Sequence, residues 1–186
     1  MPLAEPQTLP PGKTLPDYLK PGLKLMIIGI NPGIYSAQIG HYYGRPGNLF
    51  WWALSNSGLV PKPFGPENDS ELLDYGIGLT DVVKRPTNSS GDLRQAEYDL
   101  GVKRIVNLLE THQPKVACFV GLLGATAFLG RQIKAGPIQE KIGTSKLYAV
   151  PSTSRRNAHY GRDGILQYFR DLAHFVSTVS SDITYR

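Results

Sequence analysis

A short apolar run, broken abruptly by glycine and proline, constrains this chain more than any other stretch. Residues 25–28 read Leu-Met-Ile-Ile, which is typical of a strand buried on both faces of a sheet. The next residues, Gly29-Ile-Asn-Pro-Gly33, end that strand because glycine and proline interrupt regular structure. The proline also holds Asn31 in an extended or turn conformation. Ligands bind at the carboxyl ends of strands in open α/β sheets, so Asn31 is a candidate functional residue.

Strands alternate with helices along the rest of the chain. The apolar patterns predict strands over residues 24–29, 77–83, 115–120 and 146–150, and helices over 47–57, 69–74, 93–112, 122–129 and 161–179. This alternation predicts a single three-layer α/β/α domain with a short parallel central sheet. We expect the domain to span residues 23–180, between an irregular N-terminal arm (1–22) and a tail (181–186). Six of the 15 prolines fall in the arm, within which residues 15–19 are expected to form one turn.

Composition narrows the classes of function. A chain of 186 residues with 41% hydrophobic content suits one domain, and we expect neither a membrane span nor a signal peptide. One cysteine excludes an intramolecular disulfide, and the four histidines show no zinc-binding spacing, so we expect no metal and no cofactor. The net charge of +5 permits a polyanionic partner. We expect a monomer in the bacterial cytoplasm, or in the nucleus if the source is eukaryotic.

Several motifs occur together in a fixed order. They are Gly29-Ile-Asn-Pro-Gly33, Tyr43, Gly47-Asn-Leu-Phe-Trp51, residues 75–87 (YGIGLTDVVKRPT) and Val150-Pro-Ser-Thr-Ser-Arg-Arg-Asn157. Over roughly residues 22–175 the chain resembles the mismatch-specific uracil/thymine DNA glycosylases, which are DNA repair enzymes of the uracil-DNA glycosylase superfamily. Two separated motifs in the right order make this resemblance more specific than either motif alone.

The resemblance implies a uracil-DNA glycosylase-like fold and a monofunctional glycosylase. Such an enzyme flips uracil, with thymine or damaged pyrimidines as further candidates, out of mispairs with guanine in double-stranded DNA, and hydrolyses its N-glycosidic bond with an activated water. The alternatives are a uracil-DNA glycosylase with little opposite-base preference and a non-catalytic mismatch-binding relative. A nucleotide-binding α/β protein also stays open, although Gly121-Leu-Leu-Gly124 does not match the dinucleotide fingerprint and is read as a strand-to-helix turn.

Two residues are the candidate catalytic groups. From local sequence alone, Asn31 is better explained as a turn former, but the resemblance implies that it positions the attacking water. Asp81 stands where relatives carry Asn or Lys. Local sequence favours an ion pair of Asp81 with Lys84 or Arg85, or a short-range cap. Beside a pocket, the same carboxylate could act as a general base or stabilise the sugar cation.

The resemblance also implies a base-binding group. Its members are Gly29, Ile30, Gly33, Tyr43 and Asn48. Tyr43 is either a core aromatic or the platform on which the flipped base stacks, and the two roles are compatible. For Asn48 a helix N-cap is the favoured interpretation. Backbone amides over residues 30–34 are candidates for stabilising the departing base anion.

A basic loop follows the last predicted strand. Its candidate DNA-binding residues are Ser152, Ser154, Arg155, Arg156 and Asn157. Hydroxyls and amides there could hold a phosphate, and the arginines bring positive charge. The resemblance implies that Arg156 is the wedge that fills the hole left by the flipped base. Relatives carry a small residue in place of Arg155, for which a contact with the opposite strand is one role. Without the first motif, a solvated basic loop would be the better interpretation.

Overall fold

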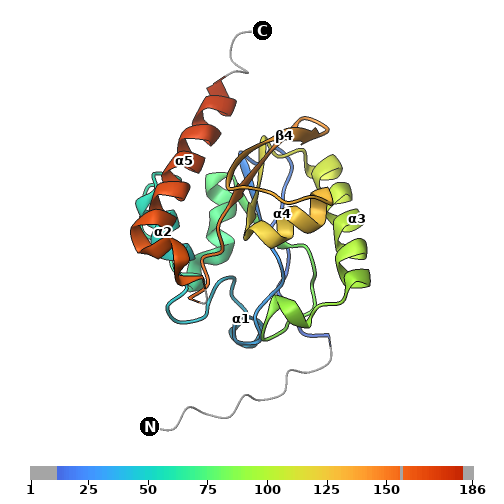
Figure 1. Ribbon diagram of the computed structural model, residues 1–186. Coiled ribbons are helices and arrows are strands. Elements are labelled where there is room, and N and C mark those ends of the chain that lie inside the picture. The colour runs from blue at the N-terminus through green and yellow to red at the C-terminus, as the bar shows by residue number, and fades with distance from the viewer. Residues whose placement is uncertain (1–11, 156, 182–186) are drawn as a thin grey trace.

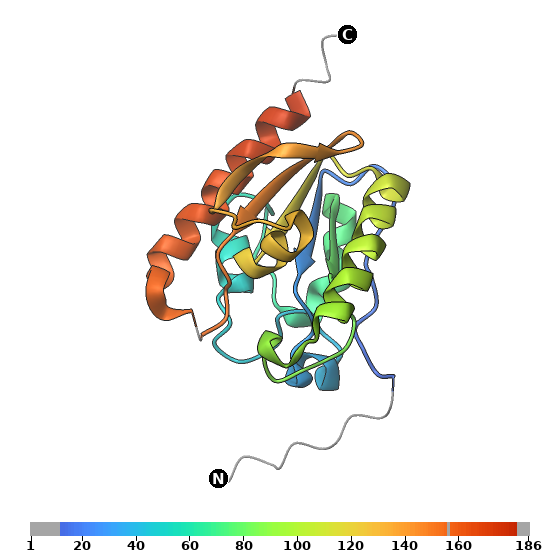
Figure 2. The same ribbon diagram turned by 45° about the vertical axis from the view of Figure 1, so that its right-hand side comes forward.

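The computed structural model describes residues 12–155 and 157–181, and it places a five-stranded sheet between two helical layers (Figures 1 and 2). The strands are Leu25–Gly29 (β1), Ile77–Asp81 (β2), Val116–Val120 (β3), Gly136–Ile142 (β4) and Ser145–Val150 (β5). The α-helices are Ile34–Ile39 (α1), Phe50–Asn56 (α2), Gln95–His112 (α3), Leu122–Leu129 (α4) and Gly161–Ser181 (α5). Short 3₁₀ helices cover Pro66–Tyr75 (η1), Ser90–Asp92 (η2) and Ala158–Tyr160 (η3).

The sheet has the strand order β2-β1-β3-β5-β4. Four strands run parallel, and β4 pairs with β5 in the antiparallel direction. The expected α/β fold with a parallel central sheet is therefore confirmed, with one strand that was not predicted. The sequence of β4, GPIQEKI, alternates between half-buried and exposed residues and carries a proline near its start. Such a polar pattern is tolerated at a sheet edge, and it hides the strand from a search for apolar runs.

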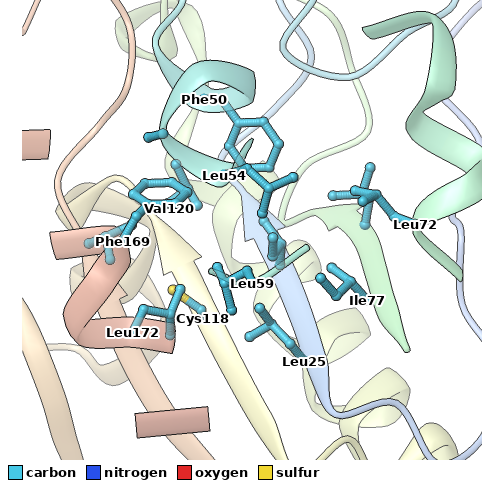
Figure 3. Packing of buried hydrophobic residues seen from close by; sticks show 14 of the residues in the cluster. Leu25, Phe50, Leu54, Leu59, Leu72, Ile77, Cys118, Val120, Phe169 and Leu172 are labelled. Carbon is cyan, nitrogen blue, oxygen red and sulfur yellow. The ribbon is translucent and has the colours of Figure 1, made fainter. Parts of the chain in front are cut away.

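Alternate side chains of the parallel strands face opposite helical layers. Leu25 and Ile27 of β1 point into the core shared with α2, α5 and η1, while Met26 and Ile28 point into the core shared with α3 and α4. Figures 1 and 2 show these helices on the two sides of the sheet. Figure 3 labels ten side chains of the first core: Leu25, Phe50, Leu54, Leu59, Leu72, Ile77, Cys118, Val120, Phe169 and Leu172. Burial on both faces explains why the parallel strands read as continuous apolar runs.

The helices agree with the sequence where apolar spacing is strong. Helix α4 has the predicted bounds, and its neighbours Gly121 (φ 106°) and Gly130 (φ 67°) form the strand-to-helix turn and the helix stop. Helix α1 was not predicted. It is only six residues long and buries just Ser36 and Ala37, so it leaves no apolar periodicity to detect.

Residues 12–22, which we call the N-terminal segment, lie against the edge of β2. The turn expected over residues 15–19 is absent, and the chain there is extended. The backbones of Tyr18 and Leu79 exchange two hydrogen bonds of 3.0 Å in an antiparallel bridge. The side chain of Leu15 is buried. The segment thereby covers part of an edge strand that would otherwise present unpaired backbone groups. In the described part of the chain, no helix has the length and apolar character to cross a membrane.

Candidate active site

The strand order creates a crevice at one end of the sheet. From β1 the chain passes through α2 and η1 on one face to reach β2, and then through α3 on the other face to reach β3. Strand β1 is therefore the point at which the chain direction across the sheet reverses, where open α/β sheets bind ligands. A pocket of about 530 Å³ lies there, bordered by the carboxyl ends of β1, β2, β3 and β5.

Ten of the predicted site residues line this single pocket. They are Gly29, Ile30, Asn31, Gly33, Tyr43, Asn48, Asp81, Ser152, Ser154 and Asn157. Of the remaining two, Arg155 lies beside the pocket, with its side chain directly over Gly47. Arg156, the predicted wedge, lies outside the described residues. Within the described ranges, no group of three or more potential metal ligands gathers.

The carboxamide of Asn31 has a fixed orientation. Its Nδ2 donates to the carbonyl of Arg85 (2.9 Å), the hydroxyl of Thr87 (2.7 Å) and, more weakly, the carbonyl of Pro32 (3.2 Å). Carbonyl oxygens only accept hydrogen bonds, so the nitrogen end must face them. The Oδ1 atom points the other way, and no described residue donates to it. The amide therefore presents an unused acceptor in the pocket.

Thr87 fixes this arrangement from the neighbouring loop. Its hydroxyl accepts from Asn31 and donates to the carbonyl of Ser89 (2.7 Å), so its hydrogen is committed away from Asn31. Its backbone also exchanges hydrogen bonds with the motif, from Thr87 N to Pro32 O (3.1 Å) and from Ile34 N to Thr87 O (3.2 Å). The Ile34 amide is thus already bonded. The expectation that amides over residues 30–34 stabilise the departing base is wrong for this one.

Asp81 ends β2 beside Gly29 and is almost completely buried, with 3% of its surface exposed. Burial raises the pKa of its carboxyl to about 7, with the charge of Lys84 lowering it, that of Asp17 raising it and that of Arg104 lowering it. Within the described residues, Oδ2 of Asp81 has no hydrogen-bond partner. Near neutral pH the group therefore exists in both protonation states, which suits proton transfer.

The ion pairs considered for Asp81 do not form among the described residues. Lys84 Nζ bonds the carboxylate of Asp17 at 2.8 Å, and Arg85 Nε bonds Glu97 at 2.6 Å. The local interpretation of Asp81 as a structural partner of Lys84 or Arg85 is therefore wrong. The interpretation failed because Lys84 and Arg85 pair with Asp17 and Glu97, which are not their neighbours in the sequence.

Tyr43 presents one ring face to the pocket. Phe50 stacks on the other face, with ring centroids 3.8 Å apart and an interplanar angle of 17°. The hydroxyl is buried and has no hydrogen-bond partner among the described residues. Tyr43 also has a φ of 51°, which is uncommon for a residue with a side chain and costs of order 1 kcal/mol.

Contacts on both sides of Tyr43 hold this strained backbone. The amide of Tyr42 donates to Asp69 (3.0 Å), and the carbonyl of Tyr42 accepts from the indole of Trp51 (2.9 Å). On the other side, the amide of Gly44 donates to the hydroxyl of Ser36 (3.1 Å). The surrounding structure thus fixes the ring orientation before any ligand binds.

The described residues of the loop over 151–157 are braced internally and against α2. The amide of Asn157 donates to the carbonyl of Ser154 (2.9 Å), and its side chain donates to the carbonyl of Ser152 (3.0 Å). The amide of Leu49 donates to the carbonyl of Thr153 (3.0 Å). These bonds hold the loop at the rim of the pocket.

The interpretation of Asn48 as the helix N-cap is wrong, because Leu49 is the N-cap of α2 and Asn48 lies one residue before it. Its Oδ1 accepts from the amide of Phe50 (3.0 Å) at the start of α2, while its side chain also lines the pocket. Sequence reasoning missed Leu15 and Tyr160, which line the pocket from the N-terminal segment and from η3. No local signal could have found them, because both are brought to the site only by folding. Thr87 belongs to the motif over residues 75–87, but its hydrogen bond with Asn31 was not predicted.

A methyl group on Gly29 tests how closely these groups approach. A Cβ there would overlap Oδ1 of Asp81 and lie 3.1 Å from the hydroxyl of Tyr43. We expect Gly29→Ala to destabilise the fold by about 1–3 kcal/mol, because the carboxylate of Asp81 must move. The same movement should slow the hydrolysis that the resemblance implies for this site by roughly 100-fold. Urea unfolding and single-turnover rates measure the two effects. A Cβ at Gly33 meets nothing within 4 Å, so Gly33→Ala should leave unfolding unchanged; equal stability of both variants would contradict the collision.

The pocket brings together the aromatic ring of Tyr43, the oriented carboxamide of Asn31 and the buried carboxylate of Asp81. This arrangement is typical of an enzyme that binds a planar base and directs water at a neighbouring bond. The sequence profile of the Uracil DNA glycosylase superfamily matches residues 16–174. The chain therefore belongs to this superfamily, whose members are generally DNA glycosylases, hydrolases of N-glycosyl bonds.

The fold has a counterpart among solved structures. The solution NMR structure of a candidate uracil DNA glycosylase from Methanosarcina acetivorans aligns with a TM-score of 0.58 at 20% sequence identity. The alignment covers 87% of this chain and 96% of that one. At this identity the likeness concerns the fold, and it extends over nearly the whole of both chains.

Proposed function

We propose that this protein is a monofunctional DNA glycosylase that removes uracil mispaired with guanine from double-stranded DNA. Membership of the uracil DNA glycosylase superfamily supports uracil-containing DNA as the substrate class. Within the described residues of the pocket there is no lysine to form a Schiff base, which favours hydrolysis without a lyase step.

The observation that carries the proposal is the oriented amide of Asn31. Its nitrogen is held by Arg85 and Thr87, and its oxygen is left as an acceptor in the pocket. An acceptor held in this way can take a hydrogen bond from water and direct a lone pair of the water oxygen at C1′ of the nucleotide. Fixed positioning of a nucleophile lowers the entropic part of the barrier.

The remaining groups divide the chemistry between them. The flipped base stacks on the free face of Tyr43, since Phe50 occupies the other face. The bond between C1′ and the base nitrogen breaks as the water oxygen bonds to C1′, and the base leaves with the bonding electron pair. Asp81, in its ionised form, takes the proton that water loses. The products are the free base and an abasic site.

The loop over residues 151–157 supplies the contact with DNA. The hydroxyls of Ser152 and Ser154 stand at the pocket rim, and Arg155 adds positive charge there. We propose that Arg156, which lies outside the described residues, enters the hole left by the flipped base and reads the opposing guanine. This role requires a duplex, so single-stranded uracil should be a poorer substrate.

The test is excision from end-labelled DNA containing G·U, A·U or G·T in duplexes, or uracil in a single strand. We expect cleavage at abasic sites to be fastest for G·U and slower for A·U, since a guanine left unpaired is recognised by the loop. Equal rates on all uracil substrates would show that the opposite base is not read. Binding to mispaired duplexes without any abasic product would replace the enzyme by a mismatch-binding protein.

A further inference from the structure

Asp17 brings a carboxylate from the N-terminal segment to the back of the pocket. It accepts hydrogen bonds from the hydroxyl of Thr80 (2.8 Å), from Nζ of Lys84 (2.8 Å) and from the guanidinium of Arg104. Arg104 also donates to the backbone carbonyl of Asp81 (2.8 Å). One carboxylate thus holds a cation from the loop after β2 and another from α3, both next to the end of β2.

Without Asp17, no bonded carboxylate would offset the positive charges that Lys84 and Arg104 exert on Asp81. Lys84 follows Asp81 closely in the chain, and Arg104 donates to the backbone carbonyl of Asp81. Both positive charges favour the ionised form of the Asp81 side chain. Lys84 Nζ lies 3.3 Å from the hydroxyl of Tyr42 and 5.8 Å from its ring centroid. The anion that offsets these charges comes from a segment more than sixty residues earlier in the chain.

We propose that Asp17 is a positioning residue for the glycosylase reaction, which holds Lys84 and Arg104 in a bonded cluster and so keeps them from fixing Asp81 in its ionised form. The proposal rests on the proposed function, in which Asp81 accepts a proton. It makes the N-terminal segment part of the active site, through Asp17 behind the pocket and Leu15 in its wall.

The charges around Asp81 give this effect a direction. The groups that face its carboxyl are Asp17, Lys84, Arg104 and the phenols of Tyr42 and Tyr43. Burial and the charge of Asp81 raise the pKa values of both phenols. Burial raises the pKa of Asp17 itself, but the bonds and charges of its neighbours, led by Lys84, outweigh burial, so Asp17 stays ionised. Its negative charge raises the pKa of Asp81. Removing that charge must therefore lower the pKa of Asp81, and removing Lys84 must raise it.

The experiment compares single-turnover excision of uracil from a G·U duplex between pH 5.5 and 9 for three single variants. With a pKa of about 7, roughly a tenth of Asp81 is ionised at pH 6. Asp17→Asn should therefore react several-fold faster than the wild type at pH 6, with a ceiling of about tenfold, and equally fast at pH 8.5. Lys84→Met should be several-fold slower at pH 6 and reach the same plateau at higher pH. Asp74→Asn, with the same charge change at the opposite end of β2, should have the wild-type profile.

In the two variants, the acid limb of the pH–rate profile should shift in opposite directions. A merely structural contact would not produce this result, because its loss lowers the rate at every pH. An unmoved limb in Asp17→Asn, with a folded protein, would overturn the proposal. If Asp17→Asn does not fold, Lys84→Met alone decides, because an unmoved or downward-shifted limb contradicts the cluster.

A second readout separates this inference from the proposed function. The carbon-13 resonance of the Asp81 carboxyl, followed by NMR against pH, reports its protonation without any turnover. Its titration midpoint should fall in Asp17→Asn and rise in Lys84→Met. Movement of this midpoint in a protein without glycosylase activity would sustain the cluster and reject the reaction; an unmoved midpoint in an active enzyme would do the opposite.

Discussion

Replacing Asn31 with alanine is expected to slow single-turnover excision of uracil by roughly 100- to 10,000-fold while leaving the fold intact. The side chain is half-buried and makes its hydrogen bonds within a loop, so its loss removes the acceptor that we propose directs water, without opening the core. Freed from Asn31, the hydroxyl of Thr87 still donates to Ser89. The loop should therefore keep its conformation, and the change in unfolding free energy should stay within about 1–2 kcal/mol.

Asn56 offers a matched control for this substitution. It lies at the end of α2, is exposed, and donates its Nδ2 to the carbonyl of Trp52. Asn56→Ala should excise uracil at the wild-type rate. If Asn31→Ala retains its rate within threefold of Asn56→Ala, Asn31 is a turn former only, and the observation that carries the proposed function loses its meaning.

Asp81→Asn is expected to have two large effects of opposite kind. The first is a loss of excision by roughly 100-fold or more at pH 8, because an amide cannot take the proton that water loses. The second is a gain in stability at the same pH. An ionised carboxylate without a hydrogen-bond partner for Oδ2 is costly to bury, and a neutral amide of the same shape costs less.

The sign and window of the stability change follow from the pKa of Asp81. Its value is about 7 in the folded protein and near 3.8 in an unfolded chain, so the folded state binds the proton more tightly. The contribution of Asp81 to stability is therefore unfavourable above pH 7 and disappears as the pH falls from 7 towards 4. We expect Asp81→Asn to raise the free energy of unfolding by up to about 4 kcal/mol at pH 8, and by little at pH 4.

Urea unfolding of the wild type and of Asp81→Asn at pH 4, 6 and 8 measures this difference directly. A variant that is less stable than the wild type at pH 8 would mean that the carboxylate has a favourable partner in the folded protein. Unchanged single-turnover excision in Asp81→Asn would remove Asp81 from the reaction, whatever the stability shows. Because the two measurements are independent, a burial effect is separated from a catalytic one.

Much of this site could be read from the sequence because its motifs stand at strand ends. Gly29, Asn31 and Asp81 follow or close apolar runs that form β1 and β2. Strands buried on both faces are detectable as continuous apolar stretches, and parallel strands bring their carboxyl ends to one edge. Local pattern therefore predicted both the sheet and the place of the pocket within it.

Elements without strong apolar periodicity were not predicted. Strand β4 is a polar edge, and helix α1 is a short helix that buries only two small residues. The N-terminal segment was expected to be an irregular arm with one turn, but no turn forms over residues 15–19, and Tyr18 pairs with Leu79 of β2. In each case the conformation is stabilised by partners that lie far away in the chain, which local propensity does not register.

The sequence by itself determined the fold class, the parallel core of the sheet and the side chains that form the first motif. Only the tertiary structure decided which of these side chains act together. Contacts with Arg85 and Thr87 fix the orientation of the Asn31 amide. Lys84 forms its ion pair with Asp17 and not with Asp81. Hydrogen-bond partners and electrostatic fields depend on distances in space, and the residues that set them here are separated by 54 to 67 positions in the chain.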